Sequence, residues 1–132
     1  MKSGGILHAE LSGIVAGMGH GDTLVIADAG LPVPPGVRCI DLALRMGVPG
    51  FQEAVETVLS ELVVERGVAN AEQPAAAPAA AAALEAAWPP EVPLERVSHA
   101  ELKQLSAAAR AVVRTGEATP YCNIVLVAGV PF

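Results

Sequence analysis

Two side chains near the start of the chain have the chemistry for proton transfer. His20 stands between two glycines in the segment Gly19-His20-Gly21-Asp22, and Asp28 directly follows an apolar run of strand length, residues 24–27. Open α/β sheets place ligands in the crevice outside the carboxyl ends of their strands, so we expect Asp28 to border such a crevice. We expect His20, on the loop that enters the same strand, to reach the same pocket. An imidazole beside a carboxylate is suited to acid–base catalysis.

Three further polar side chains could bind a ligand that carries many hydroxyls. His99 falls in the first turn of a predicted helix, where the macrodipole disfavours a positive imidazole, so we expect a neutral ring that donates and accepts hydrogen bonds. Tyr121 and Asn123 flank Cys122 just before the last predicted strand, and in extended backbone positions i and i+2 point to the same side. A phenol and a carboxamide on one side would suit a polyol, with Cys122 pointing away into the core.

Each of these residues also has a purely structural interpretation. His20 could bond a backbone carbonyl in its loop, and Asp28 could form an Asx turn, which is compatible with ligand binding. His99 could be an ordinary surface residue, and Asn123 could complete a turn while Tyr121 is half-buried. The residue types alone leave these alternatives open.

Other classes of catalytic site find no matching pattern. No two histidines have the i, i+4 or His-x-His spacing of a compact metal site, and no Gly-x-Ser-x-Gly segment is present. The glycines around His20 precede the strand, whereas a phosphate-binding loop follows one. We therefore expect neither a metal nor a cofactor. The two cysteines, Cys39 and Cys122, lack metal-binding spacing and are interpreted as buried thiols.

Several segments spread over nearly the whole chain form a family pattern. They are His20, Ala-Asp-Ala-Gly-Leu-Pro at 27–32, Ile-Asp-Leu-Ala-Leu at 40–44, Arg-Thr-Gly-Glu at 114–117, Pro-Tyr-Cys-Asn-Ile at 120–124 and Gly-Val-Pro-Phe at 129–132. In this order and spacing they resemble the D-ribose pyranase family, which interconverts pyranose and furanose forms of ribose.

The resemblance implies roles for some of these residues. It makes His20 the proton donor and places His99 in contact with the sugar. With the residue chemistry above, we predict that Asp28, His99, Tyr121 and Asn123 bind the substrate. The catalytic base stays open between Asp28 and His99.

The resemblance also implies an assembly. We expect a closed homo-oligomer, a decamer of stacked rings, in which a neighbouring subunit borders each pocket. Burying the aromatic ring of Phe132 would stabilise such an assembly by about 1.5–3 kcal/mol, although Phe132 could instead fold back on its own core.

Two other functions remain possible from the sequence. An L-fucose mutarotase is a close relative, but that branch tends to carry a bulkier residue where this chain has a glycine in the segment 28–32. A non-catalytic sugar-binding module could use the same pocket. Measuring the exchange of free sugars distinguishes this module from both enzymes, because a binder leaves the rate unchanged.

Composition limits the class of protein and of partner. The 132 residues fit one domain, 1–132, and 52% of them are apolar, which is enough for a real core. A net charge of −6 gives no basic surface for nucleic acid or for an anionic membrane. With no signal-peptide pattern and no long apolar run, we expect a soluble, cytoplasmic protein. The family resemblance implies that its partner is a monosaccharide.

Helical and extended patterns alternate along the chain, which indicates an α/β fold with a mixed sheet flanked by helices. The apolar stripe within 8–18 predicts a helix, and so do the stripe within 50–62 and the capping pair Ser98 and Glu101 before 99–108. Residues 71–88 are rich in alanine and proline, and we interpret them as a surface helix with a mobile lead-in. Strands are predicted at 23–27, 37–42, 62–66, 92–97, 111–114 and 123–128.

Overall fold

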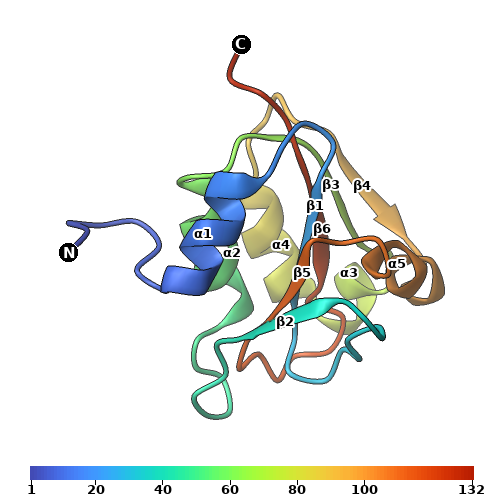
Figure 1. The fold of residues 1–132 in the computed structure, drawn as a ribbon. Helices are drawn as coiled ribbons and strands as arrows, with labels where there is room; N and C mark the ends of the chain where they lie inside the picture. The colour runs from blue at the N-terminus through green and yellow to red at the C-terminus, as the bar shows by residue number, and fades with distance from the viewer.

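The computed structural model describes residues 1–132 as a six-stranded sheet with helices on both faces (Figure 1). The strands lie in the order β2-β5-β1-β6-β3-β4. Their bounds are β1 Thr23–Ala27, β2 Arg38–Asp41, β3 Val64–Asn70, β4 Leu94–Val97, β5 Ala111–Arg114 and β6 Ile124–Ala128. The helices are α1 Ala9–Gly17, α2 Phe51–Leu59, α3 Gln73–Ala76, α4 Pro78–Ala87 and α5 His99–Ser106. The prediction of an α/β fold with a mixed sheet is confirmed.

Strand direction decides where a ligand can bind. β1 pairs in parallel with β5, β5 with β2, and β3 with β4, whereas β6 is antiparallel to both β1 and β3. All strands except β6 therefore run the same way, and their carboxyl ends share one edge of the sheet with the amino end of β6. Loops at this edge converge from segments that are far apart in the sequence.

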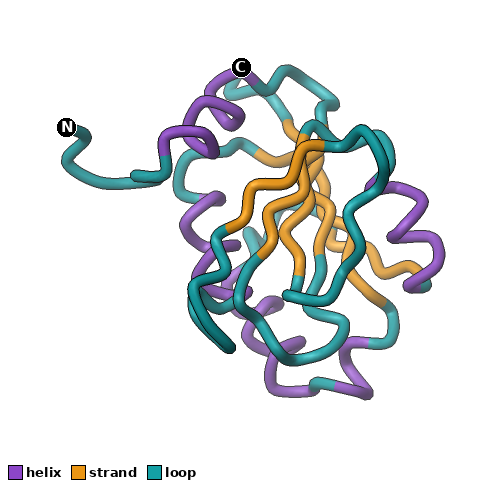
Figure 2. Tube along the Cα trace, turned by 60° about the horizontal axis from the view of Figure 1, so that its bottom comes forward, coloured by secondary structure: helices purple, strands orange, loops and turns teal.

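The alternation of side chains along β1 explains why the sheet is covered on both faces. Leu24 and Ile26 belong to the larger core, which the sheet forms with α1, α2 and α4. Val25 and Ala27 point to the opposite face and pack with Leu102 of α5. Figure 2 shows the strands enclosed between helices on both sides. Because both faces are buried, β1 is a continuous apolar run rather than an alternating one.

Three local expectations differ from the structure. β3 runs to Asn70 rather than ending at 66, because Gly67 lets the strand pass directly under the indole of Trp88. In the segment 71–88 the predicted surface helix is present as α4, but the lead-in before it forms a further short helix, α3, whose Gln73 is fully buried. Cys39, expected to be buried, is exposed on the edge strand β2.

The helices are short, and none is long and apolar enough to cross a membrane.

Candidate active site

The loops at the carboxyl ends of β1 and β5 form an open pocket of about 470 Å³. Asp28 enters it from the end of β1, and His99 enters it from the first residue of α5. The segment between β5 and β6 supplies one wall, and Met46 closes part of the rim. The lining residues are Asp28, Ala29, Gly30, Leu31, Met46, His99, Glu117, Ala118, Thr119, Pro120 and Tyr121.

Hydrogen bonds on both carboxylate oxygens fix Asp28. Its Oδ1 accepts from the backbone N–H of Gly30 at 3.0 Å, which is the Asx turn anticipated from the sequence. Its Oδ2 accepts from Nδ2 of Asn123 at 3.1 Å, and the backbone N–H of Asp28 donates to Oδ1 of the same Asn123 at 2.9 Å. The carboxylate thus orders its loop while it faces the pocket.

Asn123 lies beneath the pocket rather than on its wall. The side chain is fully buried, and its Nδ2 also donates to Oδ1 of Asn70 at 3.0 Å. The expected common face of Tyr121 and Asn123 does not form, because Tyr121 has a positive φ of 61° and the extended backbone begins only at Ile124. In this structure Tyr121 lines the pocket, whereas Asn123 makes hydrogen bonds with Asp28 and does not line the pocket.

His99 is held in place by contacts with Asn70, Glu72 and Tyr121. Its Nδ1 lies 3.1 Å from Nδ2 of Asn70, and its backbone N–H donates to Oε1 of Glu72 at 3.0 Å. The Tyr121 ring meets the imidazole edge to face, with centroids 5.3 Å apart. Ser98 caps the helix as expected, since its hydroxyl accepts from the backbone N–H of Glu101 at 3.2 Å. His99 therefore presents a fixed ring to the pocket.

Glu117 anchors the wall between β5 and β6. Burial raises the pKa of its carboxyl, but hydrogen bonds from Phe51, Thr119 and Ala118 outweigh this effect and hold the pKa below its ordinary value. The Phe51 N–H lies at the start of α2, so the carboxylate also caps that helix at 3.1 Å. Glu117 is an ionised structural anchor and a weak base.

Cys122 points away from the pocket, as expected. The thiol is buried, and its Sγ accepts from Nε2 of Gln73 at 3.6 Å. Burial raises its pKa to about 11, so the thiol stays protonated near neutral pH. Gln73 is itself bonded to Arg96, which connects this corner to β4. The pair Gln73 and Cys122 is part of the scaffold of the site.

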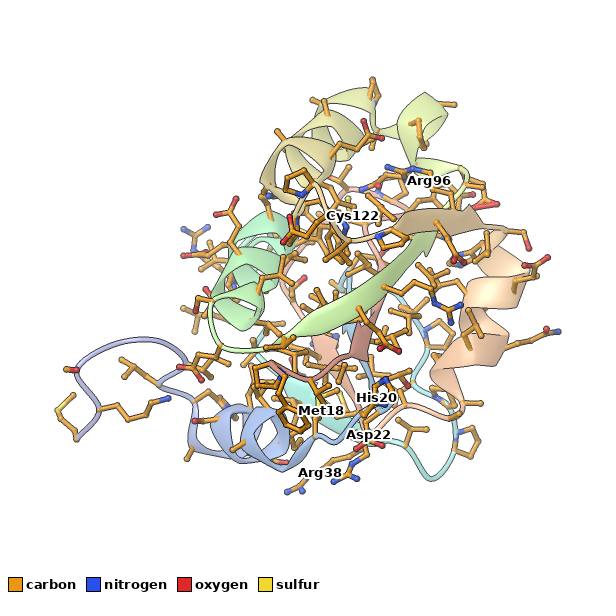
Figure 3. All side chains as sticks on the ribbon, turned by 90° about the horizontal axis from the view of Figure 1, so that it is seen from above. Met18, His20, Asp22, Arg38, Arg96 and Cys122 are labelled. Carbon is orange, nitrogen blue, oxygen red and sulfur yellow. The ribbon has the colours of Figure 1, made fainter.

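His20 is the predicted site residue that the fold keeps apart from the others. It precedes β1, whereas Asp28 follows it, and β1 spans roughly 16 Å at about 3.3 Å per residue. Its Nε2 lies 2.7 Å from Oε2 of Glu65, at the start of β3, while Asn70 ends β3 beside the pocket. Figure 3 shows His20 near Met18 and Asp22, far from Cys122 and Arg96. The expectation that His20 reaches the pocket of its own chain is wrong.

Three residues of the site were not predicted from the sequence. Asn70 and Glu72 lie at and beyond the end of β3, and Glu117 lies in the loop after β5. Only Glu117 had a signal in the sequence, since it belongs to the Arg-Thr-Gly-Glu segment. The prediction that β3 ends at 66 left Asn70 and Glu72 away from the edge where the ligand was expected.

Comparison with known proteins places the whole chain in one family. Residues 1–131 match the RbsD / FucU transport protein family. The chain is 54% identical over 132 residues to a D-ribose pyranase from Symbiobacterium thermophilum and 53% identical to D-ribose pyranase 1 from Rubrobacter xylanophilus, with full coverage of both chains in each pair. The structure of Bacillus subtilis RbsD complexed with D-ribose matches it with a TM-score of 0.95 and 48% identity over 100% of both chains. The chain therefore belongs to the RbsD / FucU family.

Proposed function

We propose that this protein is a D-ribose pyranase, which interconverts the pyranose and furanose forms of ribose. The observation that carries the proposal is the match over the entire chain to a structure described as a complex with D-ribose. The pocket suits such a ligand, because a carboxylate, an imidazole and a phenol line it together. The full-length relatives named D-ribose pyranase give independent support.

Ring interconversion needs only proton transfer. The ring opens when the ring oxygen gains a proton while the anomeric hydroxyl loses one, and the bond between the anomeric carbon and the ring oxygen breaks to give the open-chain aldehyde. Closure through a different hydroxyl produces the other ring size and returns both protons. A positioned acid and a positioned base each contribute about 10²–10⁴-fold to such a reaction.

We assign the substrate contacts to the pocket residues. Asp28, His99 and Tyr121 face the cavity and bond the sugar hydroxyls. Asn123 contributes through Asp28, whose carboxylate it orients with a bond of 3.1 Å. Because Glu117 has a lowered pKa, it is a poor proton acceptor, and the base is Asp28 or His99.

The acid role of His20 requires a second protomer. His20 is 63% exposed at the far edge of the sheet, and Glu65 engages its Nε2, which leaves Nδ1 free to meet another molecule. Beside the pocket, Leu44 and Met46 are 79% and 77% exposed, an apolar rim typical of a protein contact. We propose that a closed homo-oligomer, a decamer, brings His20 of one protomer to the pocket of the next.

Exchange spectroscopy tests the function directly. Chelator-treated protein in catalytic amounts, with no cofactor added, is mixed with D-ribose, and the exchange between ribopyranose and ribofuranose signals is measured by NMR. We expect faster exchange for ribose than for L-fucose. A larger effect on L-fucose would make the protein a fucose-type mutarotase, and sugar binding without faster exchange would make it a binding module.

A further inference from the structure

The hydrogen bonds beneath the pocket form a chain that runs from Asp28 through Asn123 and Asn70 to His99. The backbone N–H of Asp28 at one end of this chain fixes which group donates and which accepts at every link. An amide side chain can be turned either way, but the Asp28 N–H can only donate. Its partner at 2.9 Å must therefore be the oxygen of Asn123. The reverse orientation would place the Asn123 NH₂ against the Asp28 N–H and the Asn123 oxygen against the Asp28 carboxylate.

The orientation of Asn123 in turn fixes the orientation of the Asn70 amide. With its oxygen on Asp28, Asn123 offers its NH₂ to Asn70 at 3.0 Å, so the atom of Asn70 at that contact is Oδ1. The NH₂ of Asn70 then faces the other way, toward His99 and toward Oε2 of Glu72 at 3.4 Å. The Glu72 carboxylate independently supports this orientation, because it can only accept.

The last contact determines where the proton sits on the imidazole. Asn70 Nδ2 donates to His99 Nδ1 at 3.1 Å, and this bond needs a free lone pair on Nδ1. A proton on Nδ1 would point one N–H at another. Asn70 is fully buried, so no water can relieve that conflict cheaply.

We infer that Asn70 is a positioning residue that holds His99 as the neutral Nε2–H tautomer, so that His99 is a hydrogen-bond donor to the ligand. The inference rests on the proposed function for the identity of that ligand. The inference also decides between Asp28 and His99 as the catalytic base. An imidazole that already carries its proton on Nε2 cannot accept another at that atom. Asp28 is then the pocket group that receives the proton of the anomeric hydroxyl.

An NMR measurement tests the tautomer without reference to activity. In protein labelled with ¹⁵N-histidine, long-range ¹H–¹⁵N correlation distinguishes protonated from unprotonated ring nitrogens. At a pH where the three histidines are neutral, we expect a proton on Nε2 of His99. His8 is an internal reference, because its Nδ1 accepts from the backbone N–H of Leu11 at 3.2 Å and the ring must also be the Nε2–H form. A proton on Nδ1 of His99 in the unmodified protein overturns the inference.

A variant in which residues 70 and 72 exchange an amide and a carboxylate tests the same inference. The double variant N70D/E72Q keeps the net charge, and it places a carboxylate oxygen where the NH₂ of Asn70 faces Nδ1 of His99. The new amide at position 72 can donate to the new carboxylate at position 70. We expect the proton of His99 to move to Nδ1 in this variant, and an unchanged tautomer would overturn the inference.

Activity gives a separate readout of the same change. Once Nε2 has lost its proton, His99 can no longer donate to the sugar, and we expect kcat/KM for ribose exchange to fall about tenfold or more. The single variant N70D is the fallback if the double variant folds poorly, and the spectrum of the unmodified protein decides the inference on its own. If the unmodified protein does not accelerate ribose exchange, the proposed function fails, whereas the tautomer of His99 is still measured.

Discussion

The His20 side chain makes one polar contact, the bond to Glu65, and the two side chains are 63% and 46% exposed. The conformation of its loop depends instead on Asp22, whose carboxylate accepts from the backbone N–H of Gly19 at 2.9 Å and from Arg110 at 3.2 Å. A side chain that contributes so little to the fold can be replaced without disturbing its surroundings. This makes His20 a favourable position at which to separate catalysis from stability.

We expect His20→Ala to abolish ribose exchange and to lower the free energy of unfolding by less than about 1 kcal/mol, the value of an exposed ion pair. NMR exchange and urea denaturation measure the two effects. His8→Ala is the control for activity, because His8 is also exposed and lies outside the pocket: we expect unchanged ribose exchange, although loss of the α1 cap lowers stability by about 0.5–2 kcal/mol. Full activity of His20→Ala would remove the acid role from His20.

Glu117 makes the stability of the pocket wall dependent on pH. Its pKa is lowered in the folded chain, so the unfolded chain binds the proton more readily. The stabilisation is therefore complete above the ordinary value of 4.5 and is lost as the pH falls through the lower folded value. We expect Glu117→Gln to destabilise the protein by about 1–2 kcal/mol at pH 7, since charged acceptors are lost. Urea denaturation should show this difference shrinking as the pH falls below 4.5, and a constant difference would contradict the assignment.

Among the elements, the connection between β2 and α2 is packed closely against the segment after β5. The backbone N–H of Gly116 donates to the carbonyl of Pro49 at 2.9 Å, and the N–H of Gly47 donates to the carbonyl of Gly116 at 2.6 Å. A Cβ atom on Gly116 would lie 2.5 Å from the carbonyl oxygens of Arg45 and Val48. Only glycine permits this approach, which places Met46 on the rim of the pocket.

We expect Gly116→Ala to lower the free energy of unfolding by about 1–3 kcal/mol and to reduce ribose exchange, because the turn that carries Met46 must move. Gly13→Ala is the matched control: Gly13 lies within α1 with no heavy atom near its Cβ position. Alanine there should stabilise the protein by about 0.5–1 kcal/mol and leave the exchange rate unchanged. Equal stability of the two variants in urea would show that the close approach is unimportant.

The elements that the sequence predicted well are those with one dominant local signal. β1 is predicted with its bounds at 23–27, and the Ser98 cap marks the start of α5. α1 and α2 are found from their apolar stripes, although each is shorter than the predicted range, 8–18 for α1 and 50–62 for α2. In these segments local preference and tertiary packing favour the same conformation.

The predictions from sequence are wrong where long-range contacts determine the structure. Gly67 discourages a strand when it is taken alone, yet β3 pairs with β4 and β6 on its two sides and continues to Asn70. The roles of Asn70 and Gln73 depend on partners 53 and 49 residues away, Asn123 and Cys122. No local pattern reports such contacts. His20 was misplaced for a related reason, since nearness in the sequence does not bring together the two ends of a strand.

For the molecule as a whole, the separation of His20 from the pocket makes assembly a requirement of the proposed mechanism. Phe132 is fully exposed, and Leu44 and Met46 project beside the pocket, so a single chain leaves several apolar side chains in water. We expect light scattering at micromolar concentration to report a closed oligomer, with the mass of a decamer. A monomeric mass together with full activity would contradict both the assembly and the shared site.

Mixing two inactive variants tests whether the site is shared between protomers. His20→Ala keeps Asp28, and Asp28→Asn keeps His20, so a mixed oligomer contains some pockets in which both side chains are intact. If each pocket combines Asp28 of one protomer with His20 of the next, random assembly of equal amounts restores about a quarter of the unmodified activity, since each half is present with a probability of about one half. Co-expression of the two variants, followed by NMR exchange on ribose, measures the recovery. Each variant alone should stay inactive. Were His20 and Asp28 to act within one chain, every pocket would lack one of them and mixing would restore nothing.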